Sequence, residues 1–143
     1  MITYEMVKTL GPGQLEAVRN LYASEGWWYE ADQQDAERLS RIVSGSLFFC
    51  LALRDGEVIG MGRALGDGVS DAYIQDVTVR SDQRRRGIAA ELVGRLVEAL
   101  TGSGFTWIGL IATPQSHRLY RKLGFEDMED NTPMCLIGLD PKR

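Results

Sequence analysis

The stretch of residues 72–112 constrains the fold more than any other part of the chain, because two strand-like runs flank a long amphipathic segment. Ala72 to Val79 and Trp107 to Ala112 are the two runs. Between them, apolar residues from Ile88 to Leu100 recur at the spacing of one helix face, and two glycines end the pattern. A helical crossover of this kind makes the two flanking strands parallel. The stretch therefore predicts an α/β domain.

The rest of the chain predicts a strand, two helices, an antiparallel meander and a short closing unit. Ile2, Tyr4 and Met6 alternate with polar residues, as in a half-buried strand, and helical spacing follows at Leu15 to Tyr22 and at Ala36 to Val43. Further elements are expected as strands at Leu47 to Leu53, Val58 to Leu65, Phe125 to Met128 and Met134 to Leu139, and as a short helix at Gln115 to Leu123. The expected fold class is α/β, with a mixed, mostly antiparallel central sheet flanked by helices in the order β-α-α-β-β-β-α-β-α-β-β.

Length, composition and charge narrow the class of protein. With 143 residues, 44% of them apolar and 25% charged, residues 1–143 fit one globular domain. The net charge of −4 disfavours nucleic acid as a partner, because duplex binding needs a broad positive surface. No apolar run approaches a membrane span, and the first residues do not resemble a signal peptide, so we expect a soluble, cytoplasmic protein with no membrane partner.

The cysteines and the histidine give no sign of a metal centre. Cys50 and Cys135 each lie in an apolar strand-like run, which favours buried free thiols over a disulfide. A single histidine argues against a zinc site. No metal is therefore expected.

Six residues at the start of the long helix carry the clearest chemical signal. Arg84-Arg85-Arg86-Gly87-Ile88-Ala89 joins a strand to the first turn of a helix. Backbone N–H groups there have no helical partner and the helix dipole adds positive potential, so the position favours an anion. The glycine permits close approach of the backbone, and arginines can donate charge-assisted hydrogen bonds to phosphate oxygens. Taken alone, the hexapeptide is also compatible with a solvated charge run and a turn glycine.

Two motifs in order give the chain a family resemblance. The turn resembles motif A of the GNAT superfamily of acetyltransferases, R/Q-x-x-G-x-G/A, at Arg84, Gly87 and Ala89. Downstream, Leu119-Tyr120-Arg121-Lys122-Leu123-Gly124-Phe125 is similar to the L-Y-x-x-x-G-F of that family, on a short helix after the next strand. Neither a Walker loop nor a G-x-G-x-x-G dinucleotide motif occurs. The resemblance in element order covers essentially the whole chain.

The resemblance implies a binding site for acetyl-CoA. Backbone groups of Val77 and Val79 would pair with the pantetheine arm as if it were an added strand, and backbone amides of residues 85–89 would hold the pyrophosphate. The cofactor-binding residues expected on this basis are Val77, Val79, Arg84, Arg85, Arg86, Gly87, Ile88, Ala89, Thr113 and Ser116. The last two stand where many relatives carry Asn and Ala, so they depart from the family pattern.

The resemblance also assigns Tyr120 as the proton donor to the departing CoA thiolate, with a locally satisfied helix tyrosine as the structural alternative. An alkyl ammonium, whose pKa is about 10.4, must lose a proton before the amine attacks a thioester. Many relatives carry a Glu in the strand before motif A, where this chain offers Gln75 and Asp76. Asp76 is the candidate base, with a salt-bridged structural role and a water relay as alternatives. Alternation puts Gln75 and Asp76 on opposite faces unless a bulge intervenes.

The acceptor side carries no family-wide motif. Trp28, Tyr29 and Glu30 lie in an acidic, aromatic connector that suits an ammonium, although such aromatics also often pack over a sheet edge. With Gln75 they are the candidate substrate-binding residues. The sequence thus predicts an N-acetyltransferase that moves the acetyl group of acetyl-CoA to a primary amine of a small molecule, by direct attack in a ternary complex. A non-catalytic acyl-CoA sensor and an enzyme that acts on a polypeptide amine are the alternatives, and a homodimer is left open.

Overall fold

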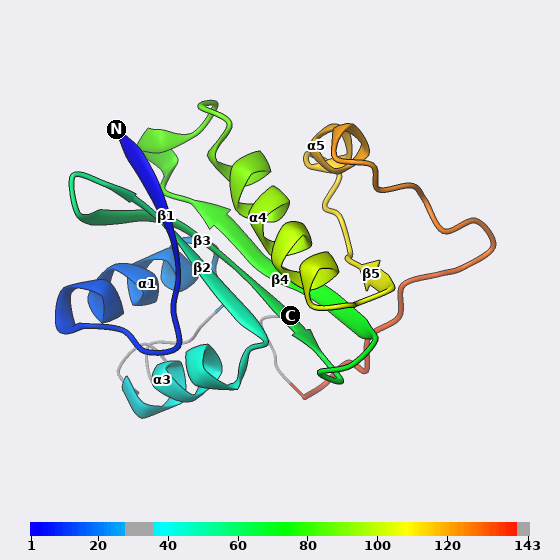
Figure 1. Cartoon of the computed structure of the whole chain (residues 1–143), viewed down its shortest axis with the longest axis horizontal. Helices are drawn as coiled ribbons and strands as arrows, with labels where there is room; N and C mark the ends of the chain where they lie inside the picture. The colour runs from blue at the N-terminus through cyan, green and yellow to red at the C-terminus, as the bar shows by residue number, and fades with distance from the viewer. Residues whose placement is uncertain (28–35, 140–143) are drawn as a thin grey trace.

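A five-stranded mixed sheet forms the centre of the molecule (Figure 1). The structure is a computed structural model and describes residues 1–27 and 36–139. Across the sheet the strands follow the order β1 (Ile2–Met6), β2 (Phe48–Arg54), β3 (Glu57–Gly66), β4 (Asp71–Val79) and β5 (Trp107–Gly109). β4 and β5 are parallel, and the other neighbouring pairs are antiparallel. The predicted fold class and the predicted parallel pair are both confirmed.

Helices cover both faces of the sheet, so the domain has three layers (Figure 1). The helices are α1 (Pro12–Ser24), α3 (Ala36–Gly45), α4 (Ile88–Gly102) and α5 (His117–Lys122), and the 3-10 turn η1 (Ser81–Gln83) precedes α4. On one face, α4 buries Leu92, Leu96 and Leu100 completely. On the other, α1 and α3 bury Val18 and Leu39 against β2 and β3. Each of these helices presents one apolar stripe to the sheet, as its spacing in the sequence predicts.

The sheet opens between β4 and β5. Only three residue pairs join these strands, and on β4 they run from Asp71 to Tyr73. The rest of β4 pairs with β3 alone. Shortly after the last pair, two residues of β4 face Gly62 alone on β3, which is a β-bulge. A bulge bends its strand, so the second half of β4 has one edge without a partner strand in the described structure.

The C-terminal part of the chain differs from the prediction. The two closing strands expected at Phe125 to Met128 and Met134 to Leu139 do not form. Phe125 instead packs edge to face on the ring of Tyr120, with 5.8 Å between the ring centroids. The side chain of Met134 is 90% exposed. A strand needs a hydrogen-bonded neighbour, and β5, with three residues instead of the expected six, offers little edge to pair with.

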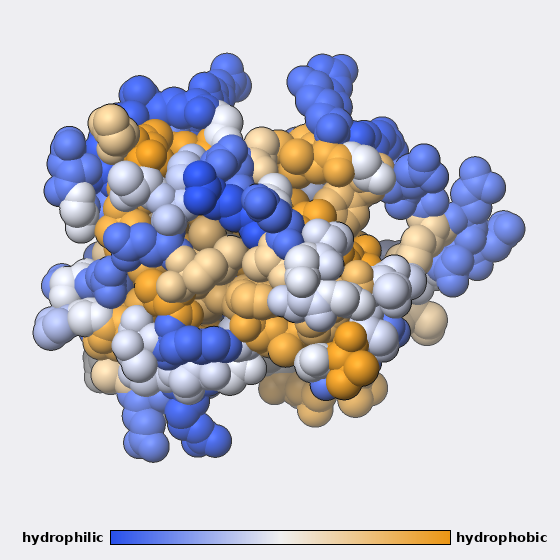
Figure 2. Space-filling model, viewed as in Figure 1, coloured by the Kyte–Doolittle hydropathy of each residue, from blue (hydrophilic) through white to orange (hydrophobic). Residues whose placement is uncertain are grey.

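The two cysteine thiols differ in exposure, because only one of them lies in a strand of the sheet. Cys50 is buried as predicted, and burial raises the pKa of its thiol to about 11. Cys135 is exposed, which corrects the prediction of a buried thiol, because the segment around it does not join the sheet. Figure 2 shows hydrophobic surface at the lower edge of the view, where the end of the described chain passes. The exposed apolar side chains of this segment are Met134, Leu136, Ile137 and Leu139.

Candidate active site

The turn between β4 and α4 has the backbone geometry of an anion site. Arg85 has a φ of 61° and Gly87 a φ of 76°, so the chain takes two left-handed steps before α4 begins. Gly87 is the N-cap of α4, and a Cβ at this position would meet nothing within 4 Å. The side chain of Ile88 points into the core, while the N–H groups of the first helical turn have no helical acceptor. The turn therefore presents backbone donors and the positive end of the helix to open space.

The three arginines of the turn differ in their surroundings. Arg84 folds back, because its Nε donates to the carbonyl oxygen of Val79 at 3.1 Å and its Nη2 lies 3.4 Å from Oε1 of Glu25. Arg85 and Arg86 are exposed and form no hydrogen bond or ion pair with another described residue. Arg84 thus braces the turn against β4 and α1. The other two guanidinium groups remain available beside the N-terminus of α4.

The unpaired edge of β4 leads directly to this turn. The N–H of Arg80 donates to the carbonyl oxygen of Ile59 on β3 at 2.7 Å. Main-chain groups point alternately to the two sides of a strand, so those of Val79 and Val77 point away from β3. The hydrogen bond from Arg84 to the Val79 carbonyl agrees with that direction. An extended ligand can therefore pair with this edge, as the sequence predicts for a pantetheine arm.

Tyr120 on α5 is half-buried and lines a cavity of about 570 Å³ with Tyr73, Leu110 and Phe125. Burial raises the pKa of the Tyr120 hydroxyl above its ordinary value of 10, because the phenolate would lose solvation. The hydroxyl makes no hydrogen bond to any residue in the described part of the chain. The structural alternative, in which a nearby residue bonds to this hydroxyl, is therefore not seen among those residues. A protonated phenol beside a cavity can donate to a ligand.

Asp76 and Gln75 lie on the same face of the sheet because of the bulge. Ile74 points into the core under α4, so Gln75, which is exposed, belongs to the opposite face. Asp76 has a φ of 56°, and its Oδ2 accepts hydrogen bonds from the hydroxyl of Tyr22 at 2.8 Å and from Nε of Arg63 at 2.6 Å. The salt-bridged structural role weighed for Asp76 is therefore present in the structure. Its role as a base stays a prediction.

Among the described residues, no hydrogen bond or ion pair joins the remaining candidates to the turn. The hydroxyl groups of Thr113 and Ser116 lie 3.0 Å apart at the start of α5, and Ser116 also donates to the Thr113 carbonyl. Their contact with the cofactor stays a prediction. Trp28, Tyr29 and Glu30 lie outside the described residues, so their place on the acceptor side is also still a prediction.

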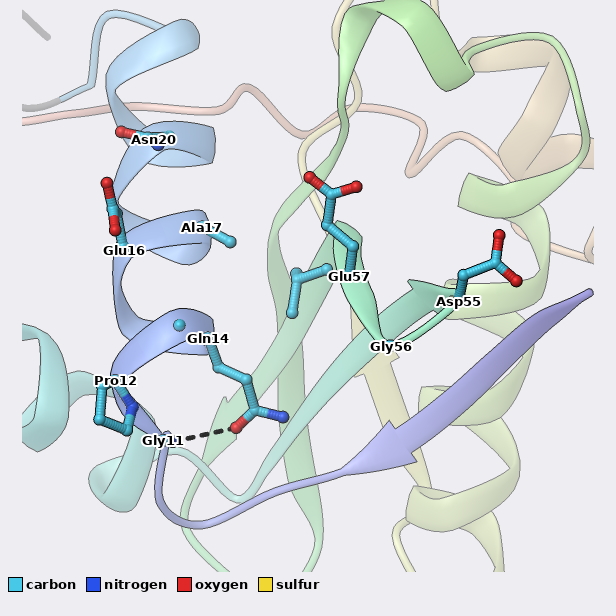
Figure 3. Close-up of a pocket in the computed structure, with 11 residues that line it drawn as sticks. Gly11, Pro12, Gln14, Glu16, Ala17, Asn20, Asp55, Gly56 and Glu57 are labelled. Carbon is cyan, nitrogen blue, oxygen red and sulfur yellow. Dashed lines mark hydrogen bonds between the residues drawn. The ribbon is translucent and has the colours of Figure 1, made fainter.

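A larger cavity, of about 620 Å³, lies between the N-terminal half of α1 and the β2–β3 turn (Figure 3). Gln14 accepts a hydrogen bond from the N–H of Gly11 there, at 3.0 Å. Glu16, Asp55 and Glu57 line this cavity and repel an anionic ligand. It shares no residue with the β4 edge or with the arginine turn and is therefore separate from the candidate site.

Residues 1–27 and 36–139 contain neither a metal centre nor a membrane-spanning helix. No group of three or more His, Cys, Asp or Glu side chains there is arranged to hold a metal ion. No helix in this part of the chain is long and apolar enough to cross a membrane.

Three residues at the site are not evident from the sequence. Glu25, at the end of α1, accepts a hydrogen bond from Thr78 of β4 at 2.5 Å. Tyr22 and Arg63 hold Asp76. None of these residues belongs to a motif, and each reaches β4 from an element distant in the sequence. The one available signal was the three-residue spacing of Tyr22 and Glu25, which puts them on one face of a helix.

Comparison with known proteins agrees with this geometry. The Acetyltransferase (GNAT) family matches residues 15–125. Serotonin N-acetyltransferase 2, chloroplastic, of Oryza sativa subsp. japonica is 39% identical over 113 residues, which cover 76% of this chain and 54% of the rice protein. The solved structure of a GNAT family acetyltransferase from Streptococcus pneumoniae is 32% identical, with a TM-score of 0.75, and the match covers 98% of this chain and 100% of that one.

A structure described as a predicted acetyltransferase with acetyl-CoA, from Clostridium acetobutylicum, shares the fold at 18% identity and a TM-score of 0.72, over 94% of this chain and 96% of that one. The curated relatives are longer proteins. The chain spans 54% of the rice enzyme and 28% of GCN5-related N-acetyltransferase 2, chloroplastic, of Arabidopsis thaliana. The family match extends over most of the chain and includes the arginine turn and Tyr120. The chain therefore belongs to the GNAT family of acetyltransferases.

Proposed function

We propose that this protein transfers the acetyl group of acetyl-CoA to a primary amine of a small molecule, by direct attack in a ternary complex. The observation that carries the proposal is the continuous path from the unpaired edge of β4 to the turn at the N-terminus of α4. This path offers main-chain partners to an extended arm, followed by backbone donors and arginines for phosphate groups. Acetyl-CoA carries an amide-containing arm and a pyrophosphate in the matching order.

The residues of the path fit this ligand. Val77 has main-chain groups directed to the unpaired edge, and the outer side of Gly87 is open to an approaching phosphate. Arg85 and Arg86 are exposed cations in a chain whose net charge is −4. Bound acetyl-CoA would supply an acetyl group activated as a thioester. The side chains around the opening supply orientation and proton transfer.

The opening between β4 and β5 separates the two candidates for proton transfer. Tyr120 packs against the core under α4, whereas Asp76 is bonded to Tyr22 in the core under α1. Direct attack requires the amine and the acetyl group to meet at one point. We infer that the amine approaches from the α1 face and the acetyl group from the α4 face.

Proton transfer can be assigned to named atoms. Hydrogen-bond donors occupy Oδ2 of Asp76, and Oδ1 has no partner among the described residues. Oδ1 would accept the proton that the ammonium loses, directly or through a water. The new N–C bond then forms as the C–S bond breaks. The Tyr120 hydroxyl would donate a proton to the thiolate as it leaves, and the second proton that the attacking nitrogen loses would restore the Tyr120 hydroxyl, directly or through a water.

Surroundings of the opening support a flat aromatic amine as one acceptor to test. Tyr73 is 47% exposed and meets Trp107 edge to face, with 5.0 Å between the ring centroids. This aromatic surface lies on the same face as Gln75. The rice relative is named for serotonin, which is a primary arylalkylamine. Serotonin is therefore the first acceptor to try.

The decisive experiment measures thiol release from acetyl-CoA with a panel of amines. The panel contains serotonin, an aliphatic diamine and a lysine-containing peptide, and mass spectrometry identifies the acetylated product. We expect release with at least one small amine and none with Gly87→Glu. Release with the peptide alone would move the acceptor class to polypeptides. Binding of acetyl-CoA without release by any amine would overturn the proposal in favour of an acyl-CoA sensor.

A further inference from the structure

The bulge of β4 is built on a non-glycine residue in a left-handed conformation. Asp76 has a φ of 56°, and it faces Gly62 together with Val77. A Cβ makes this conformation costly, although Asp and Asn tolerate it better than most residues. A Cβ on Gly62 would lie only 3.3 Å from Cγ2 of Val77 and 3.2 Å from Cδ1 of Leu96, so the space opposite the bulge is narrow. Surrounding contacts must hold such a conformation in place.

One carboxylate oxygen ties the bulge to two other elements. Oδ2 of Asp76 accepts hydrogen bonds from Tyr22 on α1, at 2.8 Å, and from Arg63 on β3, at 2.6 Å. The side chains of Arg63 and Asp76 are 15% and 8% exposed, so the ion pair is shielded from water. Charge-assisted hydrogen bonds are strong in such surroundings, and removal of one partner leaves a buried charge without its counterpart.

We propose that Tyr22 and Arg63 are positioning residues for acetyl transfer, which act through Asp76 on the bulge. The bulge stands just after Tyr73, where β4 loses its pairing with β5. Its geometry therefore sets the direction of the strand edge that carries Val77. The same two hydrogen bonds fix the Asp76 carboxylate and thereby the direction of Oδ1. This inference rests on the proposed function for the identity of the ligand and adds the side chains that shape its site.

Loss of this network should loosen the bulge without unfolding the domain. β4 pairs with β3 on both sides of the bulge, so the sheet keeps its register there. Tyr22 is 1% exposed, and its ring meets Trp27 edge to face. Phenylalanine keeps the buried ring and its contact with Trp27, and it removes the hydroxyl that bonds to Asp76. Tyr22→Phe is therefore a mild test of the network.

The test uses Tyr22→Phe and Arg63→Lys, with Glu57→Gln as the control. Lysine keeps the charge of Arg63 and loses the geometry of its Nε donor. Glu57 on β3 pairs with Arg80 at 2.9 Å, but it is 68% exposed and lies away from the bulge. Calorimetry gives the Kd of acetyl-CoA, and kinetics give kcat and KM with an accepted amine. We expect each test variant to raise Kd and lower kcat about tenfold, as loss of a hydrogen bond to a charged group does. Glu57→Gln should change neither.

Two further comparisons separate positioning from proton transfer. Tyr22→Phe added to Asp76→Asn should cause no additional loss of kcat, because both substitutions act through one carboxylate. Across pH, Tyr22→Phe should lower the rate by a constant factor. Loss of a base would instead be partly rescued at high pH, where free amine is abundant.

Three results would overturn the inference. The first is wild-type Kd and kcat in folded Tyr22→Phe and Arg63→Lys proteins. The second is a lower melting temperature as the only change, which would mean a purely structural network. The third is full additivity of Tyr22→Phe with Asp76→Asn. If the wild-type protein acetylates no amine, the proposed function fails, but the calorimetric comparison still decides whether the network shapes the acetyl-CoA site.

Discussion

Two observations support Tyr120 as the proton donor: its place in the motif and the burial of its side chain. Burial raises the pKa of its hydroxyl above its ordinary value of 10, so the phenol keeps its proton at neutral and mildly alkaline pH. An alkyl ammonium has a pKa of about 10.4 and supplies more free amine as the pH rises. We therefore expect kcat/KM to rise with pH and to show no decline from Tyr120 ionisation below about pH 9. A falling limb near pH 8 would assign the proton donor to another group.

Substitution of Tyr120 by phenylalanine tests the same role directly. The ring would keep its edge-to-face contact with Phe125, so the fold should be unaffected. The hydroxyl is expected to act on charge that develops as the thiolate leaves, so kcat should fall about 100-fold while the Kd of acetyl-CoA changes little. Steady-state kinetics and calorimetry measure the two quantities. An unchanged kcat would remove Tyr120 from the mechanism.

Gln83, just before the arginine turn, is a buried polar side chain with an unsatisfied oxygen. It is 8% exposed, and its Oε1 has no hydrogen-bond partner among the described residues, while Nε2 makes only a 3.3 Å contact with Asp82 there. Gln83→Leu removes the unpaired acceptor at similar volume, so we expect urea unfolding to show a gain of about 1 kcal/mol. Gln115→Leu, at an exposed position, is the matched control and should change stability by less than about 0.5 kcal/mol. A less stable Gln83→Leu protein would indicate that Oε1 has a partner in solution.

At the residue scale, the sequence predicted where the site residues lie in the fold better than where their side chains point. Its motif placed Arg84 beside a helix N-terminus, but the spacing could not show that this side chain turns back to Val79 and Glu25. Likewise, alternation along β4 separated Gln75 from Asp76, and only the bulge opposite Gly62 brings them to one face. Both outcomes depend on contacts between segments distant in the chain. A single sequence does not contain that information in a local pattern.

At the scale of elements, one aspartate organises the β3–β4 hairpin. Oδ1 of Asp67 accepts hydrogen bonds from the N–H groups of Val69, Ser70 and Asp71, at 2.7, 2.8 and 3.2 Å. These backbone donors, Val69 first, hold the pKa of the Asp67 carboxyl well below its usual range. The native state therefore binds fewer protons than the unfolded state near pH 4, so the contribution of Asp67 is present above that pH and is lost on acidification.

The expected measurement is the melting temperature between pH 7 and pH 2. Asp67→Asn keeps an acceptor oxygen and removes the titration, so the variant should lose less stability than the wild type on acidification below about pH 4. Asp55→Asn, in the β2–β3 turn, is the control, because the carboxylate of Asp55 accepts no hydrogen bond from a described residue. It should follow the wild-type acid curve. Identical acid curves for Asp67→Asn and the wild type would contradict the assignment.

Elements with local signals were predicted well, and elements that need a distant partner were not. The turn residues Asp55-Gly56 separate β2 from β3, and helical spacing marks α4 over nearly its full length. Met134 to Leu139 has the apolarity of a strand, but it lies exposed and unpaired. Apolarity favours burial without choosing the neighbour, and a strand exists only when a neighbour supplies its hydrogen bonds.

At the scale of the whole molecule, the positive charge of the arginine turn is opposite in sign to the net charge of the chain. The chain has a net charge of −4, and yet three consecutive arginines stand at the N-terminus of α4. In Figure 2, the surface over this turn, at the top of the view, is largely hydrophilic. The turn can therefore attract an anionic ligand to a protein whose net charge repels anions. The cationic amine proposed as acceptor would be favoured by the negative net charge of the chain.

Binding of acetyl-CoA at this turn should stabilise the whole fold. A ligand that binds only the native state adds free energy of unfolding by mass action, about 2.7 kcal/mol at a concentration of 100 times Kd. For a domain of this size such a gain raises the melting temperature by several degrees. Thermal denaturation with increasing acetyl-CoA measures the shift. Absence of a shift at saturating ligand would contradict the cofactor assignment.

Gly87→Glu tests whether the rise in melting temperature with acetyl-CoA depends on the arginine turn. Gly68→Glu is its matched control. Both glycines have positive φ, 76° and 82°, and at both a Cβ would meet nothing within 4 Å. Each substitution therefore adds similar backbone strain and one negative charge, so both variants should melt below the wild type by similar amounts. Gly87→Glu should also lose the stabilisation by acetyl-CoA, because the new carboxylate occupies and repels the phosphate position. Gly68→Glu, in the β3–β4 turn, should keep it. A folded Gly87→Glu protein that still gains stability from acetyl-CoA would show that the pyrophosphate binds elsewhere.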